Sequence, residues 1–439
     1  MTSALRFSGD VLILGKQTRK VHRDMKVLFV TRDKYPPFRP AATAIFNVEL
    51  AARGHEIDWV MQASGSQPAE VIWYGNGKAF IAANNSGDSR FRRVLSHVYD
   101  LMNCLRVFRL IRQNRYDIVQ VKDHYLPAII TLIACKLYKA PFCYWLAYPH
   151  AEESLYKAKE VSSRYPVYYL LRGHFFQWLL YRVIMRNSVH TFVQSEQMKS
   201  DIAEHGIRMC DMTAVPGSVN LENIPFERGQ KEMPELDDMG SGAVLYLGTL
   251  SRVRHMDFLI RAFEKVLRAC PSSKLYVLGK GDGPEDTEFL EEQTRQLNIA
   301  DHVVFTGHIP MERAWEYIRR AAVCVSPYYP TMILNSTSPT KLIEYMAMAR
   351  PSVGNDHPEQ RLIIEQSGAG LCTKYEESAF ADAIVSLLND PELAEQMGRK
   401  GRKYVEQHRT NSVIADIVER QYLQICKKPN DRQAALQDN

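Results

Sequence analysis

Short apolar runs alternate along this chain with longer segments in which apolar residues recur at helical spacing. In the first half, an apolar run at 26–30 precedes a segment of helical spacing at 41–53, and a segment of strand character follows at 55–60. This order and these lengths predict a strand–helix–strand unit of a parallel sheet. The first half holds further elements, with strands predicted at 117–121, 142–148 and 189–193 and helices at 91–113 and 127–139, and the segment 213–217 closes the first domain.

The second half repeats the alternation more regularly. Its predicted strands lie at 243–247, 274–278, 302–305, 323–326, 352–354 and 370–373. Its predicted helices lie at 256–269, 285–297, 311–320, 339–348, 359–366, 376–390, 393–408 and 412–423. Between the halves, residues 221–242 are polar, acidic and rich in turn-forming residues, which is typical of an interdomain linker.

This alternation predicts an α/β protein of two doubly wound, Rossmann-like domains that face each other across a cleft, with ligands at the carboxyl ends of the strands. We expect a first domain at 25–220, the linker at 221–242, a second domain at 243–408, a C-terminal helix at 409–425 that packs on the first domain, and a polar tail at 426–439. For residues 1–24 we expect either a poorly ordered extension or a chain start placed too early.

Composition narrows the class of protein. The chain has 439 residues, which suits two domains, and its 46% hydrophobic and 24% charged residues are ordinary for a globular protein. A net charge of +5 is small for this length and does not indicate a nucleic-acid partner. The 8 cysteines are scattered without a C-x-x-C pair, which argues against a disulfide framework and a zinc site and favours a reducing compartment.

No stretch of about 18 apolar residues is present, so we expect no spanning helix and a cytoplasmic protein, either free or at the inner face of the cell membrane. Two segments, 91–113 and 165–186, are basic and rich in aromatic or aliphatic residues. They suit a peripheral contact with an anionic membrane surface. Packing against the sheet of the first domain, with the arginines reaching out to solvent, is the simpler interpretation.

The stretch 326–349 predicts an anion-binding helix start. Ser338 stands where an N-cap belongs, Pro339 suits the first turn, and Thr340 and Lys341 follow. The free N–H groups of such a helix start attract anions. Glu344 lies in the second turn, where a carboxylate can accept hydrogen bonds from sugar hydroxyls. An ordinary capped helix with a surface glutamate is the alternative.

Three further loops follow predicted strands of the second half. The loop 247–255 contains Gly248, which permits close approach of a phosphate, and the cations Arg252 and Arg254. The loop 279–284, with Gly279 and Gly281, has neither dinucleotide-binding nor Walker spacing. The third loop, 306–310, contains His308 and Ile309 and could hold a flat base. Each loop alone fits a solvated turn, but together they stand where a sugar-nucleotide site requires them.

The second half resembles the donor domain of retaining glycosyltransferases with the GT-B fold, in the broad group called glycosyltransferase family 4. The residues that carry the likeness are VLYLGTLSRVRHMDFLIRAF (244–263), KLYVLGKGDGP (274–284), VVFTGHIP (303–310) and SPTKLIEYMAMARPSVGND (338–356). The first half adds MKVLFV (25–30), LAARGHEIDWV (50–60), DIVQVKD (117–123), YWLAYPH (144–150), VQSEQMK (193–199) and VPGSVN (215–220). The likeness covers about residues 25–425.

The resemblance implies roles for particular residues. Arg254, with Lys341, would hold the donor diphosphate and stabilise the departing nucleotide, Glu344 would bind the ribose hydroxyls, and His150 would lie near the transferred sugar. It implies a nucleotide-diphosphate-sugar donor, a glycan or lipid-linked acceptor, retention at the anomeric carbon, and neither metal nor cofactor. The remaining donor-binding residues are Gly248, Thr249, Arg252, Gly279, Gly281, His308, Ile309, Ser336, Ser338, Pro339 and Thr340.

The chain departs from the family pattern in three places. Ser336 stands where the first of two glutamates is expected, and Thr249 stands where a phosphate-binding arginine is expected, so Arg252 or Lys341 would have to compensate. The sequence PPFRPA (36–41) replaces a Gly-Gly loop. These departures leave two alternatives open: a catalytically silent sugar-nucleotide-binding partner, or a GT-B-like epimerase of sugar nucleotides.

Overall fold

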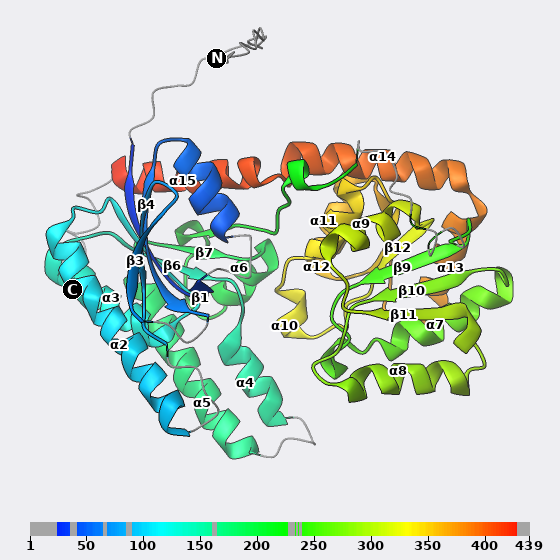
Figure 1. Cartoon of the computed structure of the whole chain (residues 1–439), viewed down its shortest axis with the longest axis horizontal. Helices are drawn as coiled ribbons and strands as arrows, with labels where there is room; N and C mark the ends of the chain where they lie inside the picture. The colour runs from blue at the N-terminus through cyan, green and yellow to red at the C-terminus, as the bar shows by residue number, and fades with distance from the viewer. Residues whose placement is uncertain are drawn as a thin grey trace, which may run out of the picture.

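The computed structural model describes residues 24–35, 42–64, 68–84, 90–159, 165–226, 233, 236 and 239–427. Two lobes, each built on one sheet with helices packed against it, make up the molecule (Figure 1). This arrangement confirms the predicted α/β class with two doubly wound domains. The predicted N-terminal extension, the loop 36–41 and nearly all of the polar tail lie outside the described residues.

The N-terminal lobe has an eight-stranded sheet in the order β3-β4-β2-β1-β5-β6-β7-β8. All neighbours pair in parallel except β3 and β4, which form an antiparallel hairpin at the edge. Its central strands are buried along their whole length, which explains their continuous apolar runs. The strands are β1 (Lys26–Tyr35), β2 (Glu56–Ala63), β3 (Glu70–Tyr74), β4 (Gly77–Ile81), β5 (Ile118–Lys122), β6 (Phe142–Leu146), β7 (His190–Val193) and β8 (Met212–Ala214).

Helices cover both faces of this sheet. On one face, side chains of α2, α3 and η2 join the core, and on the other face η1 and the last helix of the chain do so. The helical segments are η1 (Thr43–Leu50), α2 (Arg90–Gln113), α3 (Tyr125–Tyr138), α4 (His150–Lys159), α5 (Pro166–Trp178), η2 (Leu179–Ile184), η3 (Met185–Asn187), α6 (Glu196–Ala203), η4 (Met209–Asp211) and η5 (Leu221–Asn223).

The C-terminal lobe has a six-stranded parallel sheet in the order β11-β10-β9-β12-β13-β14. Its strands are β9 (Ala243–Leu247), β10 (Lys274–Leu278), β11 (Val303–Gly307), β12 (Val323–Ser326), β13 (Ser352–Asn355) and β14 (Gly370–Thr373). Its helical segments are η7 (Arg252–Arg254), α7 (Asp257–Ala269), α8 (Pro284–Gln296), η8 (Ala300–His302), α9 (Met311–Arg320), α10 (Met332–Asn335), α11 (Thr340–Ala347), α12 (Pro358–Ser367), α13 (Glu377–Asn389) and α14 (Pro391–His408).

The helix α15 (Asn411–Lys427) leaves the C-terminal lobe and packs on the N-terminal one, as the red helix in Figure 1 shows. Its buried side chains Val418 and Tyr422 belong to the core of the N-terminal lobe, and the Tyr422 hydroxyl donates to Gln120 Oε1 at 2.9 Å. At the same surface, Glu419 accepts from Arg53 at 2.6 Å and lies 2.9 Å from the ring of His55.

The observed elements differ from the predicted ones mainly in the N-terminal lobe. The hairpin of β3 and β4 was not predicted, although β3 contains the short apolar run VIWY; this run lies at the edge of the sheet and is largely exposed. The helix α10 lies inside a segment predicted as loop. Helix α11 begins at Thr340, with Pro339 at the N-cap position. Among the described residues, no helix is both long and apolar enough to cross a membrane.

Candidate functional site

Three loops at the carboxyl ends of β9, β10 and β11 are joined by backbone hydrogen bonds. Gly248 N donates to Leu278 O at 2.9 Å, and Leu250 N donates to Lys280 O at 3.0 Å. Gly279 N in turn donates to Gly307 O at 3.0 Å. The three predicted loops therefore form one connected edge of the C-terminal sheet.

Two glycines permit this close packing. At Gly279, with φ +142°, an added Cβ would lie 1.8 Å from the carbonyl oxygen of Gly248. At Gly248, an added Cβ would lie 2.9 Å from the Tyr246 hydroxyl and 3.0 Å from Lys341 Nζ. The turn after β9 thus lies directly against the ammonium group of Lys341, because no side chain separates them.

Lys341 and Arg254 come together over tyrosine rings. Lys341 Nζ donates to the Tyr246 hydroxyl at 3.0 Å and lies 4.4 Å from the centre of that ring and 5.1 Å from the centre of the Tyr328 ring. The Arg254 guanidinium carbon lies 5.8 Å from the centre of the same Tyr328 ring. The Tyr246 hydroxyl donates to Thr249 O at 3.1 Å. Two cations from separate elements, Arg254 of η7 and Lys341 of α11, therefore share the Tyr328 ring.

Charge and burial perturb both ionisable groups of α11. The pKa of Lys341 is lowered to about 7, mainly by burial and next by the positive charge of Arg254, while the charge of Glu344 opposes both effects. Burial raises the pKa of Glu344 to about 7, against the opposing effect of Lys341. Arg254 and a lysine whose ammonium group is easily deprotonated near pH 7 lie close together, and a bound anion would stabilise the charged form of both.

Arg252 lies apart from this pair. Its guanidinium stacks on Phe289 at 3.7 Å and forms an ion pair with Asp286 at 3.4 Å. Gly281 allows this loop to pack on the same aspartate, since an added Cβ would lie 2.2 Å from Asp286 Cβ. The structure therefore joins Arg252 and Gly281 to the start of α8 and leaves Arg254 and Lys341 together. His308 is exposed, and Ile309 packs against the core of the C-terminal lobe.

Ser336 and Ser338 lie at the contact between the two lobes. Ser336 O accepts from Ser195 Oγ at 2.7 Å, and Ser336 Oγ donates to Asp201. Ser338 Oγ accepts a hydrogen bond from Gly217 N at 2.9 Å and donates one to Glu359 Oε1 at 3.2 Å. Since Ser195 and Gly217 follow β7 and β8, the carboxyl edge of the N-terminal sheet faces the segment that precedes α11.

The predicted N-cap at Ser338 is therefore wrong. Its hydroxyl is used in the contact between the lobes, and no side chain caps α11, which begins at Thr340. The methyl group of Thr340 packs near Gly217, where an added Cβ would lie 2.8 Å away. An uncapped helix start beside Lys341 keeps the anion-binding character that the sequence predicted, because its amides lack a side-chain acceptor.

His150 lies on the N-terminal lobe at the start of α4, directly after β6. Its Nδ1 is 3.7 Å from Glu153 Oε2. The adjacent His150, together with Lys157 and against the effect of burial, lowers the pKa of Glu153 to about 2. Nearby, Asp123 follows β5 with φ +50° and accepts from Ala147 N at 2.7 Å. Burial raises the pKa of Asp123, and Lys122 and His150 oppose the rise.

Sequence reasoning missed Tyr246, Tyr328 and Asp123. The two tyrosines support the cation pair, yet Tyr246 occupies a buried strand position typical of a core residue, and Tyr328 lies in a loop next to a second tyrosine, Tyr329. Asp123 carries a weak signal, since a carboxylate directly after an apolar strand is a common site position in parallel sheets.

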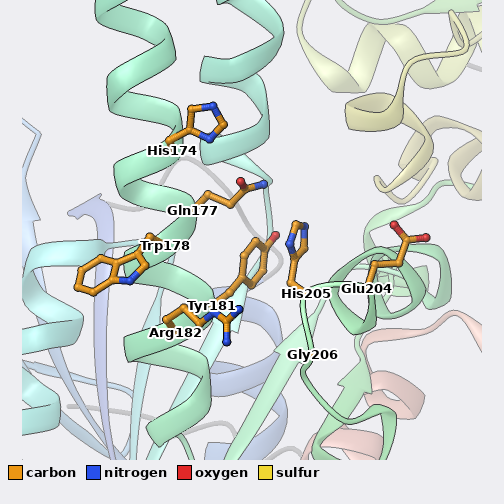
Figure 2. Close-up of a pocket in the computed structure, with 8 residues that line it drawn as sticks. All are labelled: His174, Gln177, Trp178, Tyr181, Arg182, Glu204, His205 and Gly206. Carbon is orange, nitrogen blue, oxygen red and sulfur yellow. The ribbon is translucent and has the colours of Figure 1, made fainter.

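A cavity of about 490 Å³ lies on the N-terminal lobe, between α5–η2 and the turn after α6 (Figure 2). Its lining residues are His174, Gln177, Trp178, Tyr181, Arg182, Glu204, His205 and Gly206, and none of them belongs to the predicted donor site. Within the described part of the chain, no group of three or more His, Cys, Asp or Glu residues is arranged to hold a metal ion.

Two family models match the chain. The model described as "Glycosyl transferases group 1" matches residues 241–390, and the model described as "Glycosyltransferase Family 4" matches residues 47–223. Together they span both lobes. The first match covers β9 to α13, which includes Gly248, Arg254, Lys341 and Glu344.

Curated relatives are similar over about half of the chain. An alpha-monoglucosyldiacylglycerol synthase of Streptococcus pneumoniae is 24% identical over 245 residues, which are 52% of each chain. A phosphatidyl-myo-inositol mannosyltransferase of Mycobacterium leprae is 26% identical over 229 residues, which are 51% of this chain and 57% of the relative. The chain thus spans about half the length of these curated relatives.

Solved structures share the fold across nearly the whole chain. A sucrose-phosphate synthase from Thermosynechococcus elongatus matches with a TM-score of 0.67 and 18% identity, covering 91% of this chain and 99% of that one. The Anabaena protein HepE, solved in complex with UDP-glucose, matches with a TM-score of 0.62 and 15% identity, covering 90% and 99%. At such identities the likeness supports the two-domain arrangement alone.

Proposed function

Because this chain belongs to the family 4-like glycosyltransferases of the GT-B fold, we propose that it transfers a sugar from a nucleotide-diphosphate sugar to a glycan or lipid-linked acceptor. We further propose that transfer retains the anomeric configuration and needs no metal ion. The observation that carries the proposal is the meeting of Lys341 and Arg254 over Tyr328, beside the glycine turn after β9 and the uncapped start of α11.

The chemistry of transfer requires stabilisation of a departing diphosphate. As the bond from the sugar to the diphosphate breaks, negative charge grows on the leaving oxygen while the sugar gains oxocarbenium character. Arg254 supplies a permanent charge, and an arriving diphosphate favours the protonated form of Lys341, because an anion raises the pKa of a neighbouring ammonium group. Both groups are fixed before the donor arrives, which is the arrangement that lowers a barrier by electrostatics.

Lys341, rather than Arg252, is the residue that we propose to compensate for the threonine at position 249. Lys341 Nζ lies against the turn that carries Thr249, through the Tyr246 hydroxyl that it shares with Thr249 O. Arg252 is already paired with Asp286 and stacked on Phe289. Lys341 on α11 would thus supply the positive charge that an arginine at position 249 of the loop is expected to supply in the family.

The remaining roles follow from position. Glu344 lies one turn beyond Lys341 on α11, and we assign its carboxylate to the ribose hydroxyls of the donor. His150 starts α4 at the carboxyl edge of the N-terminal sheet, which faces the C-terminal lobe at Ser336 and Ser338. We assign His150 to the sugar or acceptor side of the reaction. The acceptor hydroxyl would lose its proton to the leaving phosphate, since no enzymatic base is assigned.

Hydrolysis of donors tests the proposal. The protein is incubated with UDP-, GDP- and dTDP-sugars, and release of free nucleotide is measured, with thermal shifts as a measure of binding. We expect slow release from one class of donor, and we expect Arg254→Ala to lower that rate by about 10²–10³-fold. Arg252→Ala is the matched control, because its side chain contacts α8, and it should change the rate less than about threefold.

Two results would contradict the assignment. One is an Arg254→Ala variant that folds normally and releases nucleotide at the rate of the parent protein. The other is a protein that is neither stabilised by any nucleotide sugar of the panel nor able to hydrolyse one. A chain that binds one donor tightly without turnover and without transfer would instead support the silent binding partner.

A further inference from the structure

One face of α5 exposes large apolar side chains. The exposed residues are Tyr165, just before the helix, and, within it, Val167, Tyr168, Leu170, Leu171, Phe175 and Trp178. Leu171 and Val167 are each 67% exposed and Trp178 is 55% exposed, whereas Gly173 is the buried residue of the helix. On a monomeric protein such a continuous apolar face marks an interaction surface.

The opposite face of α5 is packed closely. An added Cβ at Gly173 would lie 2.5 Å from a methyl group of Leu155 in α4, so the two helices approach closely there. The Phe176 ring stacks on Tyr125 at the start of α3, with 4.7 Å between the ring centres. The simpler interpretation, in which this segment buries its apolar residues against the sheet, is therefore wrong for the residues listed above.

The helical layer that carries this face is strongly basic. Helices α2 and α3 and the segment from α5 to η3 contain ten of the 55 lysines and arginines of the chain but one of its 50 aspartates and glutamates, Asp100. No acidic residue occurs between Tyr165 and Asn187, while Arg172, Arg182 and Arg186 are exposed there. Because acidic residues are nearly absent there, the net positive charge is concentrated on the layer that carries the exposed apolar side chains.

We propose that this face of α5 docks on an anionic lipid bilayer, with the helix lying in the plane of the interface. Tyrosine and tryptophan combine an apolar ring with a polar group, which suits the level of the lipid headgroups. The arginines beside them would pair with lipid phosphates, each adding to the attraction. An anionic surface explains both the apolar face and the missing acidic residues, whereas a hydrophobic partner protein would explain only the first.

The cavity of Figure 2 lies along the edge of this face. Trp178 belongs both to the exposed apolar set and to the cavity lining, and Figure 2 shows Tyr181 and Arg182 on the next turn of the same helical segment. His174 and Arg182 line the cavity from α5 and η2, and His205 stacks on Tyr181 with 4.1 Å between the ring centres. A docked α5 would therefore hold the polar cavity at the level of the headgroups.

Docking would also place the acceptor side of the molecule at the bilayer. Helices α4 and α5 lie side by side and project from the N-terminal lobe (Figure 1), and α4 begins at His150. This consequence depends on the proposed function, but the docking itself does not, because it follows from the surface alone. Binding and catalysis are consequently tested by separate measurements.

Vesicle sedimentation of the full chain tests the proposal. The lipids are phosphatidylcholine alone and phosphatidylcholine with about one third phosphatidylglycerol. We expect binding to the anionic vesicles that weakens at about 0.5 M salt, because salt screens the arginines. The triple variant L171S/F175S/W178S should bind about tenfold more weakly or worse, and so should R172E/R182E.

Matched controls separate this surface from general effects. The variant V71S/W73S removes apolar side chains that are equally exposed on β3, and R268E/R295E reverses two exposed arginines of the C-terminal lobe. Both should bind vesicles as the parent protein does. Donor hydrolysis should be unchanged in all four variants, since none alters the cation pair.

Three outcomes would overturn the proposal. The first is an absence of binding to anionic vesicles at low salt. The second is equal binding by the parent protein and both α5 variants. The third is a dimer in light scattering that the triple variant dissociates, which would assign the face to a second copy of the chain.

Discussion

The two lobes place their positive charge in opposite ways. In the C-terminal lobe, Arg254 and Lys341 lie over the ring of the buried Tyr328. In the N-terminal lobe, Arg172 and Arg182 lie on the outer side of a helical layer, beside exposed apolar residues. Two partly buried cations that share a tyrosine ring are suited to one small anion, whereas exposed cations beside apolar groups are suited to an extended anionic surface. This difference supports the two proposals, donor binding by the C-terminal lobe and binding to an anionic surface by the N-terminal lobe.

A large loss of activity is expected from removing Lys341, the partly buried cation of α11. Lys341→Met should lower kcat/KM for the donor by about 10²-fold, because the leaving diphosphate loses one of its two stabilising charges. Steady-state transfer or donor hydrolysis measures the loss. Adding Thr249→Arg to this variant should restore part of the rate, since the new arginine would reach the same space from the loop. A double variant no better than Lys341→Met alone would show that the two positions are not equivalent.

A next smaller effect concerns the connected loops of the C-terminal lobe. Gly279→Ala should lower the free energy of unfolding by about 3 kcal/mol, because its Cβ would meet the carbonyl oxygen of Gly248 at 1.8 Å. Gly307→Ala is the control: its φ is +66°, but no atom lies within 4 Å of the added Cβ, so we expect about 1 kcal/mol. Chemical denaturation measures both. Equal losses would mean that the close approach at Gly279 is easily relieved.

The pH dependence of donor binding should report the pair on α11. Lys341, with its pKa lowered to about 7, binds diphosphate best below that pH, and Glu344, with its pKa raised to about 7, accepts hydrogen bonds best above it. Affinity should therefore peak near pH 7 and fall about tenfold over the next one to two pH units on either side. Titration calorimetry measures the profile. Lys341→Arg should remove the alkaline decline and Glu344→Gln the acidic one; a flat profile in the parent protein would contradict both.

The smallest expected effect lies at the contact between the lobes. Ser338→Ala removes the acceptor of the Gly217 N–H and should lower the free energy of unfolding by about 1 kcal/mol, with a change in donor KM of no more than a few fold. Thr337→Ala, whose hydroxyl bonds within the same segment to Leu334 O, is the matched control for KM and should leave it unchanged. If both variants change KM alike, the effect belongs to the segment and not to the contact.

The sequence was most informative where a physical constraint is local. The strands β9, β10 and β12 match their predicted ranges, because strands buried on both faces require continuous apolar runs. The edge strand β14 also matches its predicted range, although most of it is only partly buried. The helix start beside Lys341 was also predictable, since its signals lie within a few residues. The proline-rich loop 36–41 remains a prediction, because it lies outside the described residues.

Interactions between distant positions were not predictable in the same way. Ser338 resembles an N-cap by sequence, but its partner, the N–H of Gly217, lies 121 positions away. The tyrosines that support the cation pair come from β9 and from the loop after β12, and nothing in either local pattern connects them. Arg252 and Arg254 stand two positions apart in one basic loop. The sequence could not show that Arg252 contacts α8 while Arg254 lies with Lys341 at the Tyr328 ring.

The return of α15 to the first lobe has a consequence for how the molecule is made. Tyr422 and Val418 fill space among strands that are synthesised some three hundred residues earlier. During translation the core of the first lobe can be completed only after the whole second lobe and α15 have been synthesised. A fragment that stops after the linker would lack α15 and leave this part of the core exposed to water. Folding of the first lobe therefore depends on a helix that is synthesised after the second lobe.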